Sequence, residues 1–355
     1  MSKLKLGIIG LGGICRSRHM PTYENNPDVE LVAICDILPE KIASFKERFH
    51  IGDEVLTFTD YNELLALDLD FIDICTPNYL HSIIAVAALN RGIHVFTEKP
   101  DAVSAEEAQR MMDAAERSGK HLMAMRNNRY RQCAKYMKEF IADGRMGDVY
   151  CGRCGWIRRR GIPGKGGWFT TKAQSGGGPL IDLGVHMLDL AIWLMGNPTP
   201  VAVSGCTYTK FADNDVSDSI HSAYGDKKAD GTFDVEDLAM GFIRFDNGAC
   251  LQVETSWASN IEKEEMFVEL RGTGAGMKFS DLTGMKVFTE EKGRLLDIAP
   301  IFEPDTTIHG DNIRHFIDVL QGRAEPEFLP IQGVNMIKIL DAMYRSAAEG
   351  REIAL

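Results

Sequence analysis

Basic residues are too few for a nucleic-acid-binding protein, because the 355-residue chain has 39 Lys and Arg against 51 Asp and Glu, a formal net charge of -12. Its basic clusters, such as Arg158-Arg159-Arg160, are too short to neutralise a nucleic-acid backbone. The chain also lacks a run of about 18 apolar residues, the length of a membrane span. The first residues lead into an apolar segment without a long hydrophobic leader. We therefore expect a cytoplasmic protein that binds neither nucleic acid nor membrane.

Cysteine pairs and histidines at metal-ligand spacing are also missing. The 8 cysteines are scattered, several of them in apolar runs, which is typical of buried free thiols in a reducing compartment. Cys151 and Cys154 spell Cys-x-x-Cys, but a zinc site would need a second pair, and a redox motif would begin a helix. This pair lies in a strand-like segment instead. We predict no bound metal.

The pattern of residues 1–125 predicts an α/β Rossmann domain, a doubly wound parallel sheet, because short apolar strands alternate with helical stretches. With 45% hydrophobic residues, the chain is long enough for two domains of about 100 to 200 residues each. The strands expected in this first domain are 4–9, 30–35, 70–75, 93–97 and 121–125, and the expected helices are 14–24, 39–49, 60–66, 79–91 and 104–118.

The pattern of residues 126–355 predicts a second, α+β domain built on a mainly antiparallel sheet. Asp246-Asn247-Gly248 is a hairpin signal between two β-rich runs, and Gly272-Thr-Gly-Ala-Gly276 is interpreted as a turn because no helix follows it. Residues 210–236 predict a long surface excursion. The expected strands are 148–157, 200–210, 237–245, 249–257 and 266–272. Two final helices, 312–320 and 333–349, are expected to close the chain and to pack back on the first domain.

A glycine-rich turn, Gly10-Leu11-Gly12-Gly13-Ile14, follows the first predicted strand. Gly10 makes the turn, and Gly12 lets the backbone approach a pyrophosphate that the next helix N-terminus attracts. Cys15 replaces the third glycine of the dinucleotide fingerprint, so the loop alone is a weak signal. Asp36 ends the second strand, where a carboxylate binds a ribose 2′-hydroxyl, although a helix N-cap is the alternative. Because no Arg or Lys follows directly, NAD is favoured over NADP.

Two further strand ends carry polar residues. Thr76-Pro77-Asn78 and His81 follow the strand at 70–75, on the edge that faces the ligand crevice of such sheets, although each residue also suits an ordinary loop. Glu98-Lys99-Pro100 ends the strand at 93–97. A lysine beside a dinucleotide site suggests redox chemistry.

An apolar helix begins after Ser175-Gly-Gly-Gly178-Pro179 and carries Asp182 and His186 four residues apart, on one face. Polar groups on such a helix are costly unless they face something polar. A helix-stabilising Asp and His pair is one alternative. A metal site that recruits Asp189 is another, but it lacks a further ligand cluster.

Together these motifs resemble the Gfo/Idh/MocA oxidoreductases, the family of glucose-fructose oxidoreductase and inositol dehydrogenases. The resemblance covers essentially the whole chain and rests on four motifs in order: Gly10-x-Gly12-Gly13, Thr76-Pro77-Asn78-x-x-His81, Glu98-Lys99-Pro100 and Gly177-Gly178-x-x-x-Asp182-x-Gly184-x-His186-x-x-Asp189. It implies a nicotinamide cofactor and catalysis by Lys99, Asp182 and His186. It also implies that the second domain, residues 126–355, binds the substrate and forms homodimers or homotetramers through an open sheet. The cofactor contacts that follow from it are Gly10, Leu11, Gly12, Gly13, Ile14, Asp36, Thr76, Pro77, Asn78, His81, Glu98, Lys99 and Asn127.

The substrate contacts are less closely defined. Asn128 stands where relatives often carry an arginine, and Trp156, Arg158 and Trp168 either line the pocket or form a structural cover. Together with Asp182 and His186 as further substrate contacts, the resemblance implies NAD-dependent oxidation of a secondary hydroxyl of a sugar, glycoside or cyclitol. His186 would take the hydroxyl proton, and Lys99 would stabilise the developing negative charge. The alternatives are a member that recycles NAD internally, as glycosidase-like relatives do, and a non-catalytic NAD-binding regulator.

Overall fold

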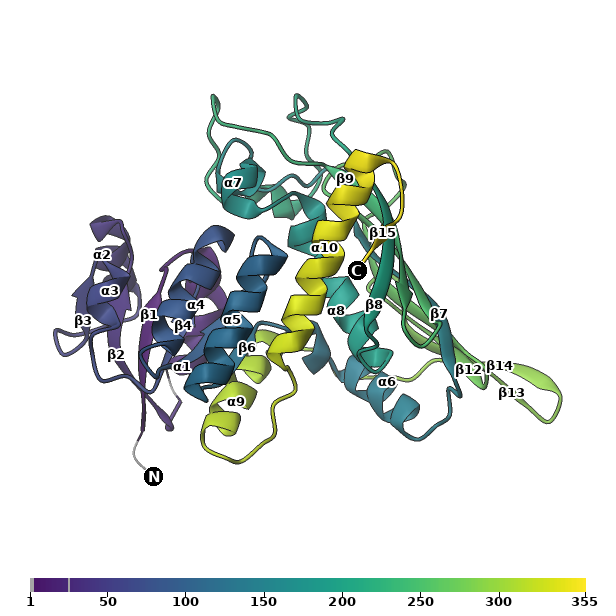
Figure 1. Ribbon diagram of the computed structural model, residues 1–355, viewed down its shortest axis with the longest axis horizontal. Helices are drawn as coiled ribbons and strands as arrows, with labels where there is room; N and C mark the ends of the chain where they lie inside the picture. The colour runs from purple at the N-terminus through teal and green to yellow at the C-terminus, as the bar shows by residue number, and fades with distance from the viewer. Residues whose placement is uncertain (1–2, 25) are drawn as a thin grey trace. The chain divides into compact units, whose positions relative to one another are not determined.

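A computed structural model describes residues 3–24 and 26–355 (Figure 1). The chain divides into two compact units. Unit 1 comprises Met1–Asn127 and Thr307–Val334, and unit 2 comprises Asn128–Thr306 and Asn335–Leu355. Each unit is described by itself below.

Unit 1 contains a 6-stranded parallel sheet in the order β3-β2-β1-β4-β5-β6, which is the Rossmann order. Its central strands are buried on both faces, as expected for a parallel sheet covered by helices. The strands are β1 (Leu4–Ile9), β2 (Val29–Cys35), β3 (Leu56–Phe58), β4 (Phe71–Ile74), β5 (His94–Thr97) and β6 (Leu122–Ala124). The predicted α/β fold is therefore confirmed.

The helices of unit 1 follow the predicted stretches closely, because their capping residues are local signals. In α5, for example, the Ser104 side chain accepts the N–H of Glu107, and Gly119 ends the helix at φ +64°. The helical segments are η1 (Cys15–His19), α1 (Met20–Tyr23), α2 (Pro39–Arg48), α3 (Tyr61–Leu64), η2 (Asn78–Leu80), α4 (His81–Leu89), α5 (Ala105–Ser118), η3 (Asn127–Tyr130, which continues into unit 2) and α9 (Ile308–Leu320). The sequence did not predict β3, a three-residue strand at the sheet edge.

Unit 2 contains a 9-stranded mixed sheet in the order β14-β13-β12-β11-β7-β10-β9-β8-β15. The neighbouring strands are antiparallel except β7 and β10, which run parallel. The strands are β7 (Val149–Ile157), β8 (Pro200–Tyr208), β9 (Leu238–Phe245), β10 (Cys250–Ser256), β11 (Glu265–Gly272), β12 (Ala275–Ser280), β13 (Gly284–Glu291), β14 (Arg294–Ile298) and β15 (Ile353–Ala354). The predicted β9–β10 hairpin and the β11–β12 turn are both present.

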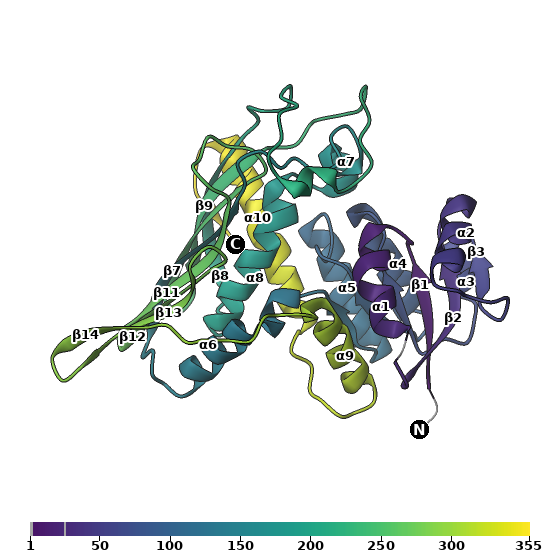
Figure 2. The ribbon, with the colours of Figure 1, turned by 180° about the vertical axis from the view of Figure 1, so that it is seen from behind.

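Helices cover one face of this sheet. In Figures 1 and 2, α8 and α10 run along the same face, while the β13–β14 hairpin extends away from them. α10 approaches closely because Gly205 and Gly241 have no side chain, and a Cβ on either would lie within 2.4 Å of Met343. The helical segments are α6 (Gln132–Ala142), η4 (Trp168–Thr170), α7 (Lys172–Ser175), η5 (Leu180–Gly184), α8 (Val185–Leu194), η6 (Ile220–Ala223) and α10 (Pro330–Glu349).

Two long segments of unit 2 bear on predictions from the sequence. Residues 210–236 are mostly exposed and carry the short η6, which confirms the surface excursion. Among the residues that the structure describes, the helical stretch Lys172–Leu194 is long and apolar enough to span a membrane by composition, and 83% of its apolar window is buried inside the protein. A buried core helix can have the same length and apolar composition, so this helix is weak evidence for a membrane span.

Candidate active site

The loop after β1 leaves open space at the start of a helix. Gly10 has φ +94°, and a Cβ there would lie 2.6 Å from the carbonyl carbon of Cys75, so the position requires glycine. A Cβ on Gly12 or Gly13 would meet nothing within 4 Å. The helix begins at Gly13, where its first backbone N–H groups have no partner within the helix. Open space above such N–H groups suits a phosphate.

Asp36 directly follows β2 and bonds to the backbone of the loop after β1. One of its carboxylate oxygens accepts the N–H of Leu11 at 2.9 Å, and the other accepts the N–H of Leu38 at 3.0 Å. Arg16 of η1 donates to the Leu11 carbonyl and, on α2, to Ser44 Oγ. Arg16 was not predicted as a cation near this site, because it comes from the helix before β2 and not from the residues directly after Asp36.

Two buried polar atoms at the carboxyl edge of the sheet lack a hydrogen-bond partner within the described part of the chain. They are Thr76 Oγ1, after β4, and Asn127 Oδ1, after β6. Buried polar atoms are normally paired, so an unpaired atom at this edge is suited to a ligand. The glycine loop, Asp36 and these two atoms therefore fit a dinucleotide.

His81 connects two of the predicted motifs. One of its ring nitrogens lies 2.8 Å from the carbonyl oxygen of Thr76, and the other lies 2.7 Å from that of Pro100. Burial lowers the pKa of His81. Both ring nitrogens face backbone oxygens, so His81 packs between these two loops and donates to one of them.

Glu98 belongs to a buried ionic cluster that sequence reasoning missed. His19 Nδ1 lies 2.7 Å from Asp73 Oδ2, and His19 Nε2 lies 2.8 Å from Glu98 Oε1. Tyr23 donates its hydroxyl to the same oxygen of Asp73 at 2.9 Å. Burial by itself disfavours the Glu98 charge, but the hydrogen bond and charge of His19 lower the Glu98 pKa to about 2. Lys99 follows this cluster directly and is half-buried.

In unit 2, Asp182 and His186 lie at the junction of η5 and α8, both half-buried on an otherwise buried helix. The indole N–H of Trp257 donates to Asp182 Oδ2 at 3.0 Å. The ring of His186 lies against that of Trp156, with 5.9 Å between centroids. Asp182 and His186 thus each have an aromatic neighbour from the sheet or its end.

Trp156 has two further neighbours, Arg158 and His221. The Arg158 guanidinium lies 4.9 Å from its ring centre, and the His221 ring contacts it edge-on at 5.9 Å. Glu264 joins both neighbours, 3.2 Å from His221 Nε2 and 3.5 Å from Arg158 Nε. Burial raises the pKa of Glu264, but the bond from His221 and the Arg158 charge outweigh it and lower the pKa. His221 lies on η6, in the exposed excursion, where the sequence offered no signal for it.

The glycines before this helix allow close packing. A Cβ on Gly177 would lie 1.9 Å from the hydroxyl of Tyr344, and one on Gly178 would lie 2.0 Å from the backbone oxygen of Glu236. The Glu236 carboxylate accepts the N–H groups of Gly178 and Leu180 and the hydroxyl of Tyr344. It therefore caps the start of the helix that carries Asp182, although burial raises the Glu236 pKa.

The other predicted substrate residues make contacts within unit 2. Asn128 is buried, and its side-chain oxygen accepts from Arg131 Nε at 2.8 Å. Trp168 is half-buried and stacks on Phe169, with 3.9 Å between ring centroids. Direct contact of Asn128 or Trp168 with a substrate stays a prediction.

The residues considered for a metal have other partners. Asp189 accepts two hydrogen bonds from Arg129, at 2.6 and 2.8 Å, which form a buried bidentate ion pair. Within the described residues, His19, Asp73 and Cys75 form a group whose potential ligand atoms lie within 4.8 Å of one another. Both nitrogens of His19 already face carboxylates, and burial raises the pKa of the Cys75 thiol. These contacts give Asp189 on the one hand, and His19, Asp73 and Cys75 on the other, structural roles inside the protein.

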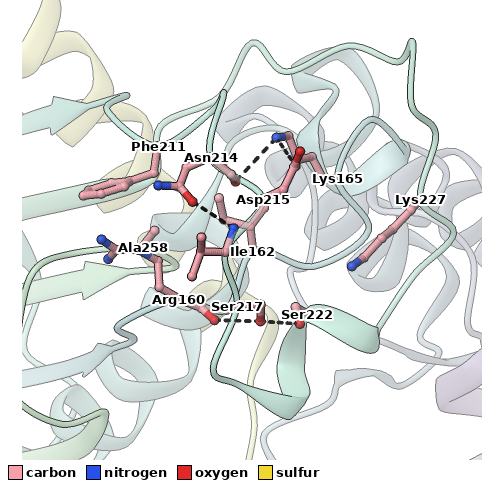
Figure 3. A pocket seen from close by; sticks show the side chains of 12 residues that line it. Arg160, Ile162, Lys165, Phe211, Asn214, Asp215, Ser217, Ser222, Lys227 and Ala258 are labelled. Carbon is pink, nitrogen blue, oxygen red and sulfur yellow. Dashed lines mark hydrogen bonds and ion pairs between the residues drawn. The ribbon is translucent and has the colours of Figure 1, made fainter.

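A cavity of about 230 Å³ lies between the loop after β7 and the excursion (Figure 3). Lys165 pairs with Asp215 at its wall, at 2.6 Å. Its lining includes Arg160, Ile162, Phe211, Ser217, Ser222 and Lys227. The surface excursion, residues 210–236, thus lines part of this cavity and also supplies His221.

Comparison with known proteins decides the family. Residues 4–125 match the Gfo/Idh/MocA model described as an oxidoreductase family with an NAD-binding Rossmann fold, and residues 134–278 match a Gfo/Idh/MocA C-terminal domain. D-glucoside 3-dehydrogenase of Escherichia coli (strain K12) is 32% identical over 355 residues, covering 100% of this chain and 98% of that protein. The chain belongs to the Gfo/Idh/MocA family.

Other known proteins match along most of their length. Levoglucosan dehydrogenase of Pseudarthrobacter phenanthrenivorans is 28% identical, covering 100% of this chain and 92% of that protein. A crystal structure of GenD2 from gentamicin A biosynthesis in complex with NAD superposes with a TM-score of 0.78 at 27% identity, covering 100% of this chain and 97% of that chain. The predictions of the family and of an NAD-dependent dehydrogenase acting on CH–OH groups are confirmed at the level of the family.

Proposed function

We propose that this protein oxidises a secondary hydroxyl of a sugar or glycoside with NAD. The observation that carries the proposal is the contact between the rings of Trp156 and His186 in unit 2. An indole face binds the apolar face of a pyranose ring, and an imidazole beside it accepts a proton from a ring hydroxyl. The pair therefore offers a binding surface for a sugar ring and a base for its hydroxyl.

The cofactor site would be the edge of the unit 1 sheet. Gly10, Gly12 and Gly13 would hold the pyrophosphate, and Asp36 would bind the ribose hydroxyls. Thr76 Oγ1 and Asn127 Oδ1 would pair with polar atoms of the dinucleotide. When bound there, NAD supplies the hydride acceptor.

The proton would be handled by the chain's own residues. His186 would accept it from the substrate hydroxyl, because an ordinary imidazole titrates close to neutral pH. The Lys99 ammonium would donate a hydrogen bond to the same oxygen and stabilise its developing negative charge. Asp182, oriented by Trp257, would hold the imidazole or a neighbouring hydroxyl.

The relatives favour glycosides and aldoses over cyclitols as substrates. The full-length matches include D-glucoside 3-dehydrogenase, levoglucosan dehydrogenase and D-apiose dehydrogenase, whereas inositol 2-dehydrogenase of Salmonella typhimurium (strain LT2) matches 41% of this chain, at 35% identity. Arg158 is buried beside Trp156 and carries donors that suit sugar oxygens. We therefore place glycosides first among the candidate substrates.

The same proposal includes a cytoplasmic homodimer or homotetramer that assembles through the sheet of unit 2. Several large apolar side chains on its strands are exposed, which supports an interface there. They include Tyr150, Val201, Tyr208, Phe288 and Leu295. Light scattering after size-exclusion chromatography tests it, and a monomer at micromolar concentration would contradict it.

The activity test uses purified protein with NAD, and separately with NADP, across glycosides, aldoses and inositols. We expect the absorbance of the reduced cofactor to rise when a glycoside is mixed with NAD, and to rise less when NADP replaces NAD. NAD binding without net NADH from any alcohol would contradict the proposal. It would favour internal recycling if glycosides are cleaved, and a non-catalytic regulator if they are not.

A further inference from the structure

The buried cluster next to Lys99 is not used in the proposed mechanism. His19 of η1 lies between Asp73 of β4 and Glu98, which follows β5, and the His19 and Asp73 side chains are fully buried. In the sequence, 54 residues separate His19 from Asp73 and 79 separate it from Glu98. The fold therefore brings three ionisable groups from three elements into its interior, where uncompensated charge is costly.

Glu98 connects this cluster to Lys99. One oxygen of its carboxylate faces His19 Nε2, and the other accepts the backbone N–H of Lys99 at 3.1 Å. The residues that follow are also held. The Pro100 carbonyl bonds to His81, and Asp101 forms a buried ion pair with Arg126. The backbone on both sides of Lys99 is thus fixed by buried partners from other elements, while the Lys99 side chain stays half-buried.

The charge state of the cluster follows from its hydrogen bonds. Each ring nitrogen of His19 faces a carboxylate oxygen, so both must carry hydrogen for both contacts to be hydrogen bonds. Burial disfavours this cation, but Asp73 and Glu98 outweigh it and raise the His19 pKa well above its ordinary value. One cation with two carboxylates leaves a net negative charge beside Lys99. The positive charges of Lys99 and His309 in turn help to lower the Glu98 pKa.

We propose that His19, acting through Glu98, is a positioning residue for Lys99. The imidazolium fixes the Glu98 carboxylate, and that carboxylate fixes the backbone from which the Lys99 side chain extends toward the substrate hydroxyl. A displacement of about 1 Å in a catalytic group costs up to roughly 100-fold in rate. The inference rests on the proposed role of Lys99 in the reaction.

The test compares His19→Gln, Glu98→Gln and Lys99→Ala with the doubles made on the Lys99→Ala background. Glu98→Gln keeps the shape and an acceptor for the Lys99 N–H but removes the charge. We expect each single change at His19 or Glu98 to lower kcat about 10-fold to 100-fold. In His19→Gln, which lies outside the predicted cofactor contacts, the Kd for NAD measured by calorimetry should change by less than about threefold, because the change acts on the reacting group.

The double variants separate positioning from simple stability. If His19 acts through Lys99, His19→Gln should lower kcat no further once Lys99 is already alanine. The control is Met111→Ala in α5, a fully buried side chain away from this cluster, which should destabilise the fold by about 2 to 4 kcal/mol and keep kcat. If His19→Gln fails to fold, Glu98→Gln and its double with Lys99→Ala decide the question.

Two results would overturn the inference. One is unchanged kcat in both His19→Gln and Glu98→Gln while Lys99→Ala loses turnover. The other is a loss in the double variant equal to the product of the single losses, which would mean that the cluster acts independently of Lys99. Unchanged turnover in Lys99→Ala itself would instead contradict the proposed function.

Discussion

Trp257 donates its indole N–H to the carboxylate of Asp182 at 3.0 Å. Trp257 is fully buried just after β10, and Asp182 lies in η5, so the sheet orients a carboxylate on the helix that carries His186. We expect Trp257→Phe to lower the free energy of unfolding by about 1 to 3 kcal/mol, because Asp182 loses a buried partner. Urea unfolding measures this change. In the same variant kcat should fall, and wild-type kcat would show that Trp257 does not orient Asp182 for the reaction.

Lys99→Ala and His186→Ala test the proposed proton handling. Each should lower turnover by roughly two to four powers of ten, the usual contribution of a general base or a charge-stabilising group. Both proteins should still bind NAD in a calorimetric titration. Retained turnover in both variants would remove these residues from the mechanism.

Asp36→Ala tests the cofactor preference. Loss of hydrogen bonds to a ribose should raise the Kd for NAD about 10-fold to 100-fold. The loss of a carboxylate from the neighbourhood of Arg16 should at the same time narrow the preference for NAD over NADP. Titration with both cofactors measures the ratio of the two Kd values, and an unchanged ratio would show that Asp36 does not discriminate between them.

Gly177→Ala should destabilise unit 2, because its Cβ would lie 1.9 Å from the Tyr344 hydroxyl that binds Glu236. Displacing that hydroxyl should cost about 1 to 3 kcal/mol. Gly276→Ala is the matched control, since its nearest neighbour would lie at an ordinary 3.5 Å. Thermal unfolding of the two variants should differ, and equal Tm values would contradict the packing argument.

The free energy of unfolding of unit 1 should fall as the pH is lowered, because of His94. Burial lowers the His94 pKa to about 4, and its Nδ1 accepts the N–H of His121, which requires an unprotonated nitrogen. Below the ordinary pKa of about 6.5 the unfolded chain binds a proton that the folded chain does not, so stability falls as the pH falls toward 4. After allowance for partial exposure we expect a loss of about 1 kcal/mol.

His94→Asn keeps an acceptor for the His121 N–H and removes the titrating ring. In urea unfolding between pH 7 and pH 4, the free energy of unfolding should therefore fall less steeply with falling pH in His94→Asn than in the wild type. Equal slopes would assign the acid sensitivity to other groups.

Local patterns in the sequence were enough for most of unit 1. Strand and helix periodicity predicted its elements, because each buries an apolar face that recurs at a regular spacing. Gly10 was predicted from its turn, and Asp36 from its distance after the loop. β13 and β14 were missed because charged residues interrupt their apolar pattern, and β3 is too short to show one.

Tertiary structure alone decided which polar residues meet. Nothing near His19 in the sequence indicates Glu98, nothing near Asp189 indicates Arg129, and the exposed excursion gave no signal that His221 would contact Trp156. The parallel pairing of β7 with β10 likewise depends on the whole sheet. The sequence by itself determined most elements of unit 1, the family motifs and the type of cofactor loop, because these depend on neighbouring residues. The partners of the buried charges depend on which distant segments the fold brings together, since a lone polar residue carries no local mark of its partner.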